Sequence, residues 1–482
     1  MSEPRDHSGV GPDTVRALDH RLARAQREGR VPSVVAAVAR REEPVWTGAA
    51  GLVGAAGLVG AAGLVGDTGL VGDTAPTADT QYRIGSISKT TVAVLVMRLV
   101  ERGEVGLDDA IGDHLADVPA PESTVRQLLS HTAGLASETP APWWERTPGD
   151  LRPQLRDILT ADPLRHPRGQ GFHYSNPGFG ILGALVTAKA GRPWFDVLHD
   201  DVLTPLGMTR TSYDPVEPYA RGWAVHPWAD VVLPEPAHDH GLLAAAGQLW
   251  STPSDLCRFG VFLGSRGGDL LQEGTLELMR RPAVAPDDPA WSGSYGLGIQ
   301  HLRFPDGDSG SLVLFGHTGS MPGFLAMCLT SADHGLTVAL QANAWSELAA
   351  GTVARDLLTI VRDREPTMPV PWAPAAPGAA AWELAGPWYW GAVPMAIRVH
   401  GEGELELGGI GARGRAGRFV PAGDGRWVGR AGSYYHGEFL DVRRDERGAI
   451  THLDLGSFVL TREPYAPADV VPDGLGLGDW QV

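Results

Sequence analysis

The sequence predicts two parts, an α+β domain with an antiparallel sheet followed by a small all-β domain. In the first part, strand-like segments and terminal helices frame a helical middle, which is typical of α+β domains. After a proline-rich stretch, the apolar residues recur at every second position, as in the short strands of a barrel or sandwich. The 482 residues are enough for two such domains.

The first elements follow from the spacing of apolar residues. A period of 3.6 predicts a helix over residues 13–28, and two strands are expected at 33–39 and around 45–46. Residues 51–74 then repeat a six-residue unit four times. Four short units cannot bury a core, so we interpret this segment as a glycine-rich surface loop rather than a β-helix.

A buried helix is predicted over residues 86–101, because its apolar side chains lie on several faces and Gly103 can end it. Helical and loop segments fill residues 108–270. The domain is expected to close with a strand at 312–315, a hairpin of strands at 324–331 and 336–343, and a helix at 347–364.

The expected domain limits follow from a change of composition. Residues 1–365 form the first domain, 366–380 a stiff Pro/Ala-rich linker, 381–465 the all-β domain and 466–482 a tail. A G-x-G-x-x-G match at 409–414 lies between strands with no helix after it, so we do not interpret it as a dinucleotide site.

Composition excludes several classes of function. The formal charge of −17 argues against binding to nucleic acid or to anionic membrane surfaces. No apolar run reaches the length of about 18 residues that a membrane span needs, so membrane insertion is not expected. The first residues lack a basic start followed by an apolar stretch, which favours a cytoplasmic location.

Metal and redox chemistry are also not expected. Cys257 and Cys328 suggest neither a disulfide framework nor a metal cluster. His238-Asp239-His240 has no further ligands at useful spacing and is interpreted as polar surface. We therefore predict no cofactor, and a small molecule or peptide as the partner.

One motif indicates nucleophilic catalysis. The chain has 38 arginines and two lysines, and one of these lysines, Lys89, follows Ser86 by three residues. On a helix the two side chains would share a face, and the helix N-terminus would favour the alkoxide of the serine. Lysine can lose its proton and act as a base, whereas arginine cannot, so Ser-x-x-Lys suggests a nucleophile beside its base.

Three further segments carry reactive residue types. Tyr174-Ser175-Asn176 precedes an apolar helix, and His317-Thr318-Gly319-Ser320 follows the strand expected to end at Phe315. Residues 128–135 (LLSHTAGL) contain Ser130 and His131, which we interpret as a structural turn between helices. The chain has no G-x-S-x-G, which argues against an α/β-hydrolase.

The ordered motifs Ser-x-x-Lys, Tyr-x-Asn and His-Thr-Gly resemble the serine β-lactamase and penicillin-binding-protein superfamily. Its members include class C β-lactamases, D-alanyl-D-alanine carboxypeptidases, D-aminopeptidases and β-lactamase-like esterases. The flanking TQYRIG at 80–85 and LLSHTAGL at 128–135 add to the resemblance, which covers about residues 10–365. It implies a β-lactamase/DD-peptidase-like fold, with an antiparallel sheet flanked by helices and an all-α subdomain, followed by a lipocalin-like barrel.

The resemblance implies a role for each motif. Ser86 would be the nucleophile and Lys89 its base, with Tyr174 sharing proton transfer and protonating the leaving group. Which of Lys89 and Tyr174 takes the first proton is left open. Asn176 would bind the amide of the acyl side chain.

The His-Thr-Gly motif would complete the site. His317 and Thr318 would line the wall opposite Asn176, Gly319 would let another backbone come close, and the backbone N–H groups of Ser86 and Ser320 would form the oxyanion hole.

The resemblance departs from β-lactamases at His317, where they place a lysine that helps to hold the substrate carboxylate. We therefore expect a serine hydrolase that forms an acyl-enzyme on Ser86 and cleaves amides or esters, most of all D-amino-acid peptides or small esters. The alternatives are a peptide-cyclising or peptide-releasing thioesterase of penicillin-binding-protein type, a β-lactamase, and a non-catalytic sensor. Substrate identity and oligomeric state are left open.

Overall fold

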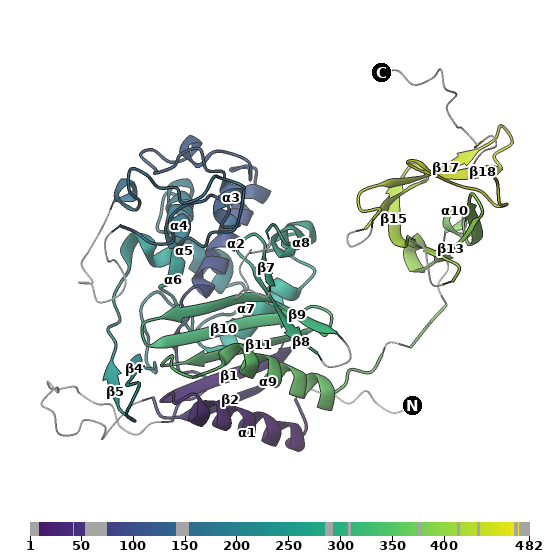
Figure 1. Cartoon of the computed structure of the whole chain (residues 1–482). Helices are drawn as coiled ribbons and strands as arrows, with labels where there is room; N and C mark the ends of the chain where they lie inside the picture. Colours follow the sequence, from purple (N-terminus) through teal and green to yellow (C-terminus); the bar gives the residue numbers. More distant parts are fainter. Residues whose placement is uncertain are drawn as a thin grey trace, which may run out of the picture. The chain divides into compact units, whose positions relative to one another are not determined.

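The computed structural model describes residues 9–41, 43–53, 75–140, 154–284, 293–306, 310–369, 371–374, 378–411, 415–430, 434–466 and 471. The chain divides into two compact units, Met1–Thr367 and Met368–Val482 (Figure 1). The repeat residues 54–74, residues 412–414 of the G-x-G-x-x-G match and most of the predicted tail lie outside the described residues.

A seven-stranded antiparallel sheet forms the centre of the first unit, with the strand order β2-β1-β11-β10-β9-β8-β7. N-terminal strands therefore pair directly with strands from the end of the unit. The strands are β1 (Ser33–Arg40), β2 (Glu43–Gly51), β7 (Gly293–Tyr295), β8 (Gln300–Pro305), β9 (Ser311–Met321), β10 (Phe324–Ser331) and β11 (Leu336–Ala342).

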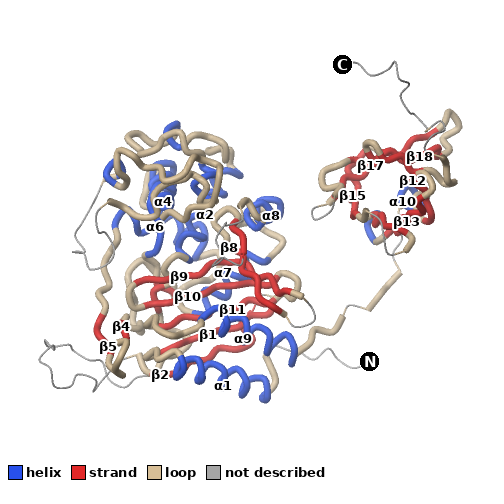
Figure 2. The backbone as a smooth tube through the Cα atoms, in the orientation of Figure 1, coloured by secondary structure: helices blue, strands red, loops and turns tan. Residues whose placement is uncertain are grey.

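Helices cover both faces of this sheet (Figure 2). Helices α1 (Pro12–Glu28) and α9 (Ala350–Arg364) pack together on one face, and α7 (Pro253–Gly264) lies across the other. Successive strand residues point to opposite faces, so Val38 belongs to the core under α1 and α9, while its neighbour Ala37 belongs to the core under α7. Because both faces of β1 are buried, residues 34–39 are all apolar.

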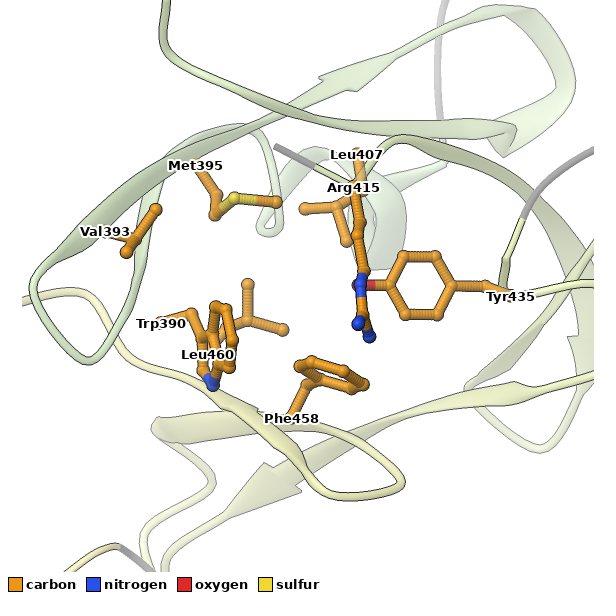
Figure 3. Close-up of a pocket in the computed structure, with 8 residues that line it drawn as sticks. All are labelled: Trp390, Val393, Met395, Leu407, Arg415, Tyr435, Phe458 and Leu460. Carbon is orange, nitrogen blue, oxygen red and sulfur yellow. The ribbon is translucent and has the colours of Figure 1, made fainter. Parts of the chain in front are cut away.

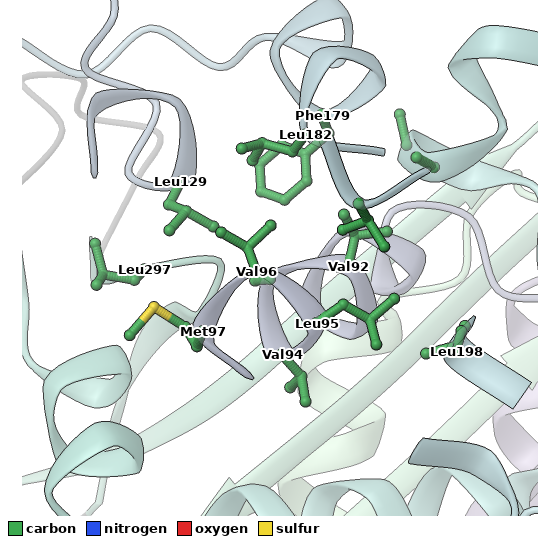
Figure 4. Packing of buried hydrophobic residues seen from close by; sticks show 14 of the residues in the cluster. Val92, Val94, Leu95, Val96, Met97, Leu129, Phe179, Leu182, Leu198 and Leu297 are labelled. Carbon is green, nitrogen blue, oxygen red and sulfur yellow. The ribbon is translucent and has the colours of Figure 1, made fainter. Parts of the chain in front are cut away.

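The helical region is built around α2 (Ile87–Glu101), which is apolar on nearly every side and packs against α4 (Asn176–Ala190) and α6 (Ala244–Gly247) (Figure 4). The helical region also contains α3 (Val125–Leu129), α5 (Trp194–Leu198) and α8 (Glu273–Arg280). Two short strand pairs lie outside the seven-stranded sheet, β3 (Tyr82–Arg83) with β6 (Trp250–Ser251) and β4 (Trp223–Val225) with β5 (Val232–Pro234). None of the described helices is both long and apolar enough to cross a membrane.

The second unit is an eight-stranded antiparallel meander that curls into a barrel around buried Trp388, Phe419 and Leu453. Paired backbone hydrogen bonds of 2.7 and 2.9 Å between Tyr389 and Thr461 join its first strand to the residue after its last. The unit contains α10 (Ala379–Trp382) and strands β12 (Gly386–Trp390), β13 (Val393–Val399), β14 (Leu405–Gly409), β15 (Gly417–Gly423), β16 (Arg426–Gly429), β17 (Phe439–Arg444), β18 (Ile450–Leu455) and β19 (Phe458–Leu460).

The fold class predicted from the sequence is confirmed, and three local predictions need correction. The strand expected at 312–315 continues to Met321, because β10 supplies ladder partners for each residue of the glycine-rich part. The helix expected from Glu347 begins at Ala350. His240 is buried rather than on a polar surface, and its ring nitrogen lies 3.1 Å from the guanidinium of Arg83.

Candidate active site

Ser86 and Lys89 lie at the start of α2, where the sequence predicted a shared helical face. Ser86 is the N-cap residue, and the Nζ atom of Lys89 donates hydrogen bonds to Ser86 Oγ at 2.9 Å and to the carbonyl of Ala246 at 2.8 Å. The second contact comes from α6, which packs along α2. A hydroxyl and an amine are thus held together by a helix turn and a backbone acceptor.

Lys89 is fully buried, and this desolvation lowers its pKa to about 7, against an opposing effect of the Glu138 charge. Burial disfavours the ammonium because the protein interior solvates a charge poorly. Near neutral pH a large fraction of Lys89 is therefore the uncharged amine, which can accept a proton from Ser86.

Tyr174 lies in the loop before α4 and reaches the same point from a distant part of the chain. Its phenol is hydrogen-bonded to Ser86, and the centre of its ring lies 4.8 Å from Lys89 Nζ. Burial raises the pKa of Tyr174 above its usual value, so the phenol keeps its proton at neutral pH. The site combines an amine that releases its proton readily with a phenol that retains one.

Asn176 is the first residue of α4, which Ser175 caps by accepting a hydrogen bond from the Gly178 amide. Asn176 is 6% exposed, and its Nδ2 donates to Glu138 Oε1 at 2.6 Å. Glu138 therefore holds the amide side chain through a hydrogen bond and acts on Lys89 through its charge.

His317 lies inside β9 and is only 3% exposed. Its Nδ1 donates to the carbonyl of Thr318 at 2.5 Å, so Nε2 accepts from the Tyr295 hydroxyl at 2.9 Å. Burial lowers the pKa of His317 to about 3, with a further lowering by the Lys89 charge. The imidazole is uncharged, and both nitrogens are bonded to protein groups rather than free to face a substrate.

Two glycines let β9 run against the start of α2. A Cβ atom on Gly319 would lie 1.9 Å from the carbonyl oxygen of Ile84 and 3.2 Å from the amide nitrogen of Ser86. Gly85 has a φ of +52°, and a Cβ there would lie 2.6 Å from the amide nitrogen of Ser320. The backbone amides proposed for an oxyanion hole therefore belong to segments in direct contact.

Thr318, the remaining predicted residue, is partly exposed beside this contact. Its Oγ1 and its backbone N–H donate to Gln300 Oε1 at 3.0 and 3.2 Å. All the predicted site residues thus lie on three neighbouring segments: the start of α2, the loop entering α4, and β9.

The sequence analysis missed four residues beside this site, Glu138, Tyr295, Gln300 and His131. His131 forms a turn with a φ of +56°, as a structural role requires, but its ring also stacks 4.2 Å from the ring of Tyr174. Its Nδ1 accepts from the Ser175 amide at 3.1 Å, which leaves a buried Nε2–H without a partner among the described residues. The LLSHTAGL motif was the available signal for His131, whereas no sequence pattern indicated the other three.

The described residues contain no group of three or more histidine, cysteine or acidic side chains that could hold a metal ion. The candidate site contains a hydroxyl, an amine, a phenol, a carboxylate, amides and a neutral imidazole.

Comparisons with known proteins agree with this architecture. Residues 16–363 match the Beta-lactamase family, and residues 377–462 match a domain of unknown function, DUF7586. The chain is 25% identical over 284 residues to beta-lactamase-like protein 2 of Dictyostelium discoideum, covering 56% of this chain and 49% of that protein. It is 32% identical over 220 residues to esterase EstB of Burkholderia gladioli, covering 42% and 52% respectively. The chain thus spans about half the length of these curated relatives.

A solved structure of the D-amino acid amidase from Ochrobactrum anthropi SV3, in complex with L-phenylalanine, matches with a TM-score of 0.57 and 25% identity. The match covers 73% of this chain and 97% of the amidase. The family match extends over most of the chain and includes every segment that contributes to the candidate site. The chain therefore belongs to the Beta-lactamase family, whose members related to it are serine hydrolases.

Proposed function

We propose that the protein is a serine hydrolase that forms an acyl-enzyme on Ser86. The observation that carries this proposal is the 2.9 Å hydrogen bond between Ser86 Oγ and the buried amine of Lys89, whose pKa lies at about 7. A nucleophile needs a base within hydrogen-bond distance that is unprotonated at the working pH.

The opposite pKa shifts of Lys89 and Tyr174 support one assignment of the two proton transfers. Lys89, as the free amine, takes the proton of Ser86 while Oγ attacks the substrate carbonyl carbon, and the oxyanion forms near the amides of Ser86 and Ser320. The protonated Tyr174 gives its proton to the leaving amine or alcohol and regains one from the Lys89 ammonium. Water then attacks the acyl ester by the reverse transfers, which releases the acid and restores Ser86.

The proposed substrates are amides or esters of D-amino acids, or small esters. Similarity to a D-amino acid amidase and to an esterase supports this class. The neutral, internally bonded His317 supports it further, because β-lactamases place a cationic lysine at this position. D-Alanyl-D-alanine peptides remain within the proposed class, and strong β-lactam hydrolysis is not expected.

Active-site labelling tests the nucleophile. A fluorophosphonate probe is expected to add once to the chain, at Ser86, as read by intact mass and peptide mapping, and Ser86→Ala should abolish the labelling. Ser130→Ala is the control, because Ser130 donates a hydrogen bond to the carbonyl of Arg126 and precedes His131 in the segment interpreted as a structural turn. Labelling that survives in Ser86→Ala, or disappears in Ser130→Ala, contradicts the proposal.

A substrate panel tests the class. D-Aminoacyl amides and p-nitrophenyl esters are expected to turn over faster than nitrocefin. The turnover rates of D-aminoacyl and L-aminoacyl amides are compared to test the preference for the D enantiomer. Nitrocefin turnover that exceeds all other substrates would overturn the class assignment while leaving Ser86 as the nucleophile. Product partitioning with an added amine acceptor separates hydrolysis from the alternative of acyl transfer.

A further inference from the structure

The barrel unit contains a cavity lined by its own side chains. Its empty space, including the open solvent at its mouth, is about 370 Å³. Four neighbouring strands of the barrel, β14, β13, β12 and β19, form its apolar lining, which consists of Trp390, Val393, Met395, Leu407, Phe458 and Leu460 (Figure 3). A small barrel normally fills its interior with side chains, so an apolar space between its strands is a candidate ligand site.

Two polar groups stand at one side of this cavity, Arg415 and Tyr435. Tyr435 is 4% exposed, and Figure 3 shows its ring pointing into the cavity with the hydroxyl toward the guanidinium of Arg415. Among the described residues, the Tyr435 hydroxyl has no hydrogen-bond partner. A hydroxyl that faces a cavity without a protein partner is available to a ligand or to water.

Arg415 is held in place by aromatic rings rather than by an acid. Its guanidinium carbon lies 3.9 Å from the centre of the Tyr434 ring and 5.0 Å from that of Phe458. Other barrel arginines form ion pairs, such as Arg426 with Asp441, whereas Arg415 has no ion pair among the described residues. Stacking fixes the plane of a guanidinium and leaves its charge and N–H edge available to an anion.

We propose that the barrel binds a small carboxylic acid with an apolar body. The carboxylate lies between Arg415 and the Tyr435 hydroxyl, and the apolar body lies against Trp390, Met395 and Phe458. One cation and one hydroxyl match the charge and the two acceptor oxygens of a carboxylate. This binding site is independent of the function proposed for Ser86.

Isothermal titration of the full chain with octanoate tests the proposal. Arg415→Gln is expected to weaken octanoate binding by about ten- to a hundredfold, and Tyr435→Phe by a few-fold, because each removes a hydrogen bond to the carboxylate. Arg398→Gln is the matched control, since Arg398 is a 72% exposed arginine of the same barrel. Acetate lacks the apolar body and 1-octanol lacks the charge, so both should bind more weakly than octanoate.

Unchanged octanoate affinity in Arg415→Gln, or the same loss in Arg398→Gln, overturns the proposal, as does the absence of binding at millimolar octanoate. Circular dichroism checks that each variant is folded. If Arg415→Gln is unfolded, Arg415→Lys and Tyr435→Phe provide the test, because both keep the cavity walls. Fluorophosphonate labelling of Ser86 should be unaffected by these barrel variants, which separates a failure here from a failure at the serine.

Discussion

At the scale of single residues, the chemistry of the site depends on how Lys89 is buried. Among the described residues, no acidic side chain is hydrogen-bonded to the amine, which is held by a hydroxyl and a carbonyl. Desolvation is the largest effect on its pKa. The same environment would accept a guanidinium poorly, because arginine is larger and stays charged. A buried, permanent charge without an acid beside it costs stability.

Replacing Lys89 should therefore separate catalysis from folding. Both Lys89→Met and Lys89→Arg are expected to slow acylation by about two to four orders of magnitude, since neither supplies a base. Only Lys89→Arg should also lower the thermal midpoint, because it buries a fixed charge. Lys189→Arg, on the last turn of α4, is the control with the chain's other lysine. Acylation rates and melting curves are the measurements, and a wild-type rate in Lys89→Met would exclude the base role.

The pH dependence should report the same amine. The value of kcat/KM is expected to rise with pH through about 7, where Lys89 loses its proton. Glu138 raises the pKa of Lys89, so Glu138→Gln should move the rise of kcat/KM to lower pH. The amide oxygen of the new glutamine can still accept the hydrogen bond from Asn176. Glu122 forms an exposed ion pair with Arg168, so Glu122→Gln should not change the pH at which kcat/KM rises. If the rise of kcat/KM occurs at the same pH in Glu138→Gln as in the wild type, a group other than Lys89 determines the pH dependence.

The stability of the fold should follow the same shift. The usual pKa of lysine is 10.5 and the folded value is about 7. Between these two pH values the unfolded chain binds a proton that the folded chain has released, so the free energy of unfolding rises with pH there.

At the scale of elements, the site depends on β9 lying directly against the first turn of α2. Gly319→Ala is expected to force these segments apart, because its Cβ would meet the Ile84 carbonyl oxygen at 1.9 Å. We expect a loss of about 1–3 kcal/mol in unfolding free energy, together with slower labelling of Ser86. Gly268→Ala has open space around its Cβ and is the control for both denaturant unfolding and labelling kinetics. Equal labelling in the two variants would show that this contact does not support the site.

At the scale of the whole molecule, the two units have separate cores and should unfold separately. Leu340 belongs to the core of the first unit, and Trp388 to that of the barrel. Calorimetry is expected to show two transitions. Trp388→Ala should lower the midpoint temperature of one transition, and Leu340→Ala that of the other. Each substitution is expected to reduce the unfolding free energy of its unit by about 2–5 kcal/mol, because both side chains are fully buried. A single transition that both variants lower alike would show that the units unfold together.

The sequence by itself determined the elements whose patterns are local. The 86–101 helix, the 324–331 and 336–343 hairpin and the period-two barrel strands follow from spacing alone. The Ser-x-x-Lys pair could also be placed on one helix, since neighbours three apart share a face whatever surrounds them. The end of β9 could not be found this way, because its glycine-rich part is extended only through pairing with β10.

Only the tertiary structure decided the state of the groups in the site. Each of these states depends on residues from separate segments. They are the burial of Lys89, the hydrogen bond of Asn176 to Glu138, and the hydrogen bond from the Tyr295 hydroxyl to His317 Nε2. The pKa of an amine, and whether the nitrogens of an imidazole can bind a substrate, depend on the groups that replace water around them. That replacement is made by side chains that pack only after folding, so no local pattern of the sequence contains it.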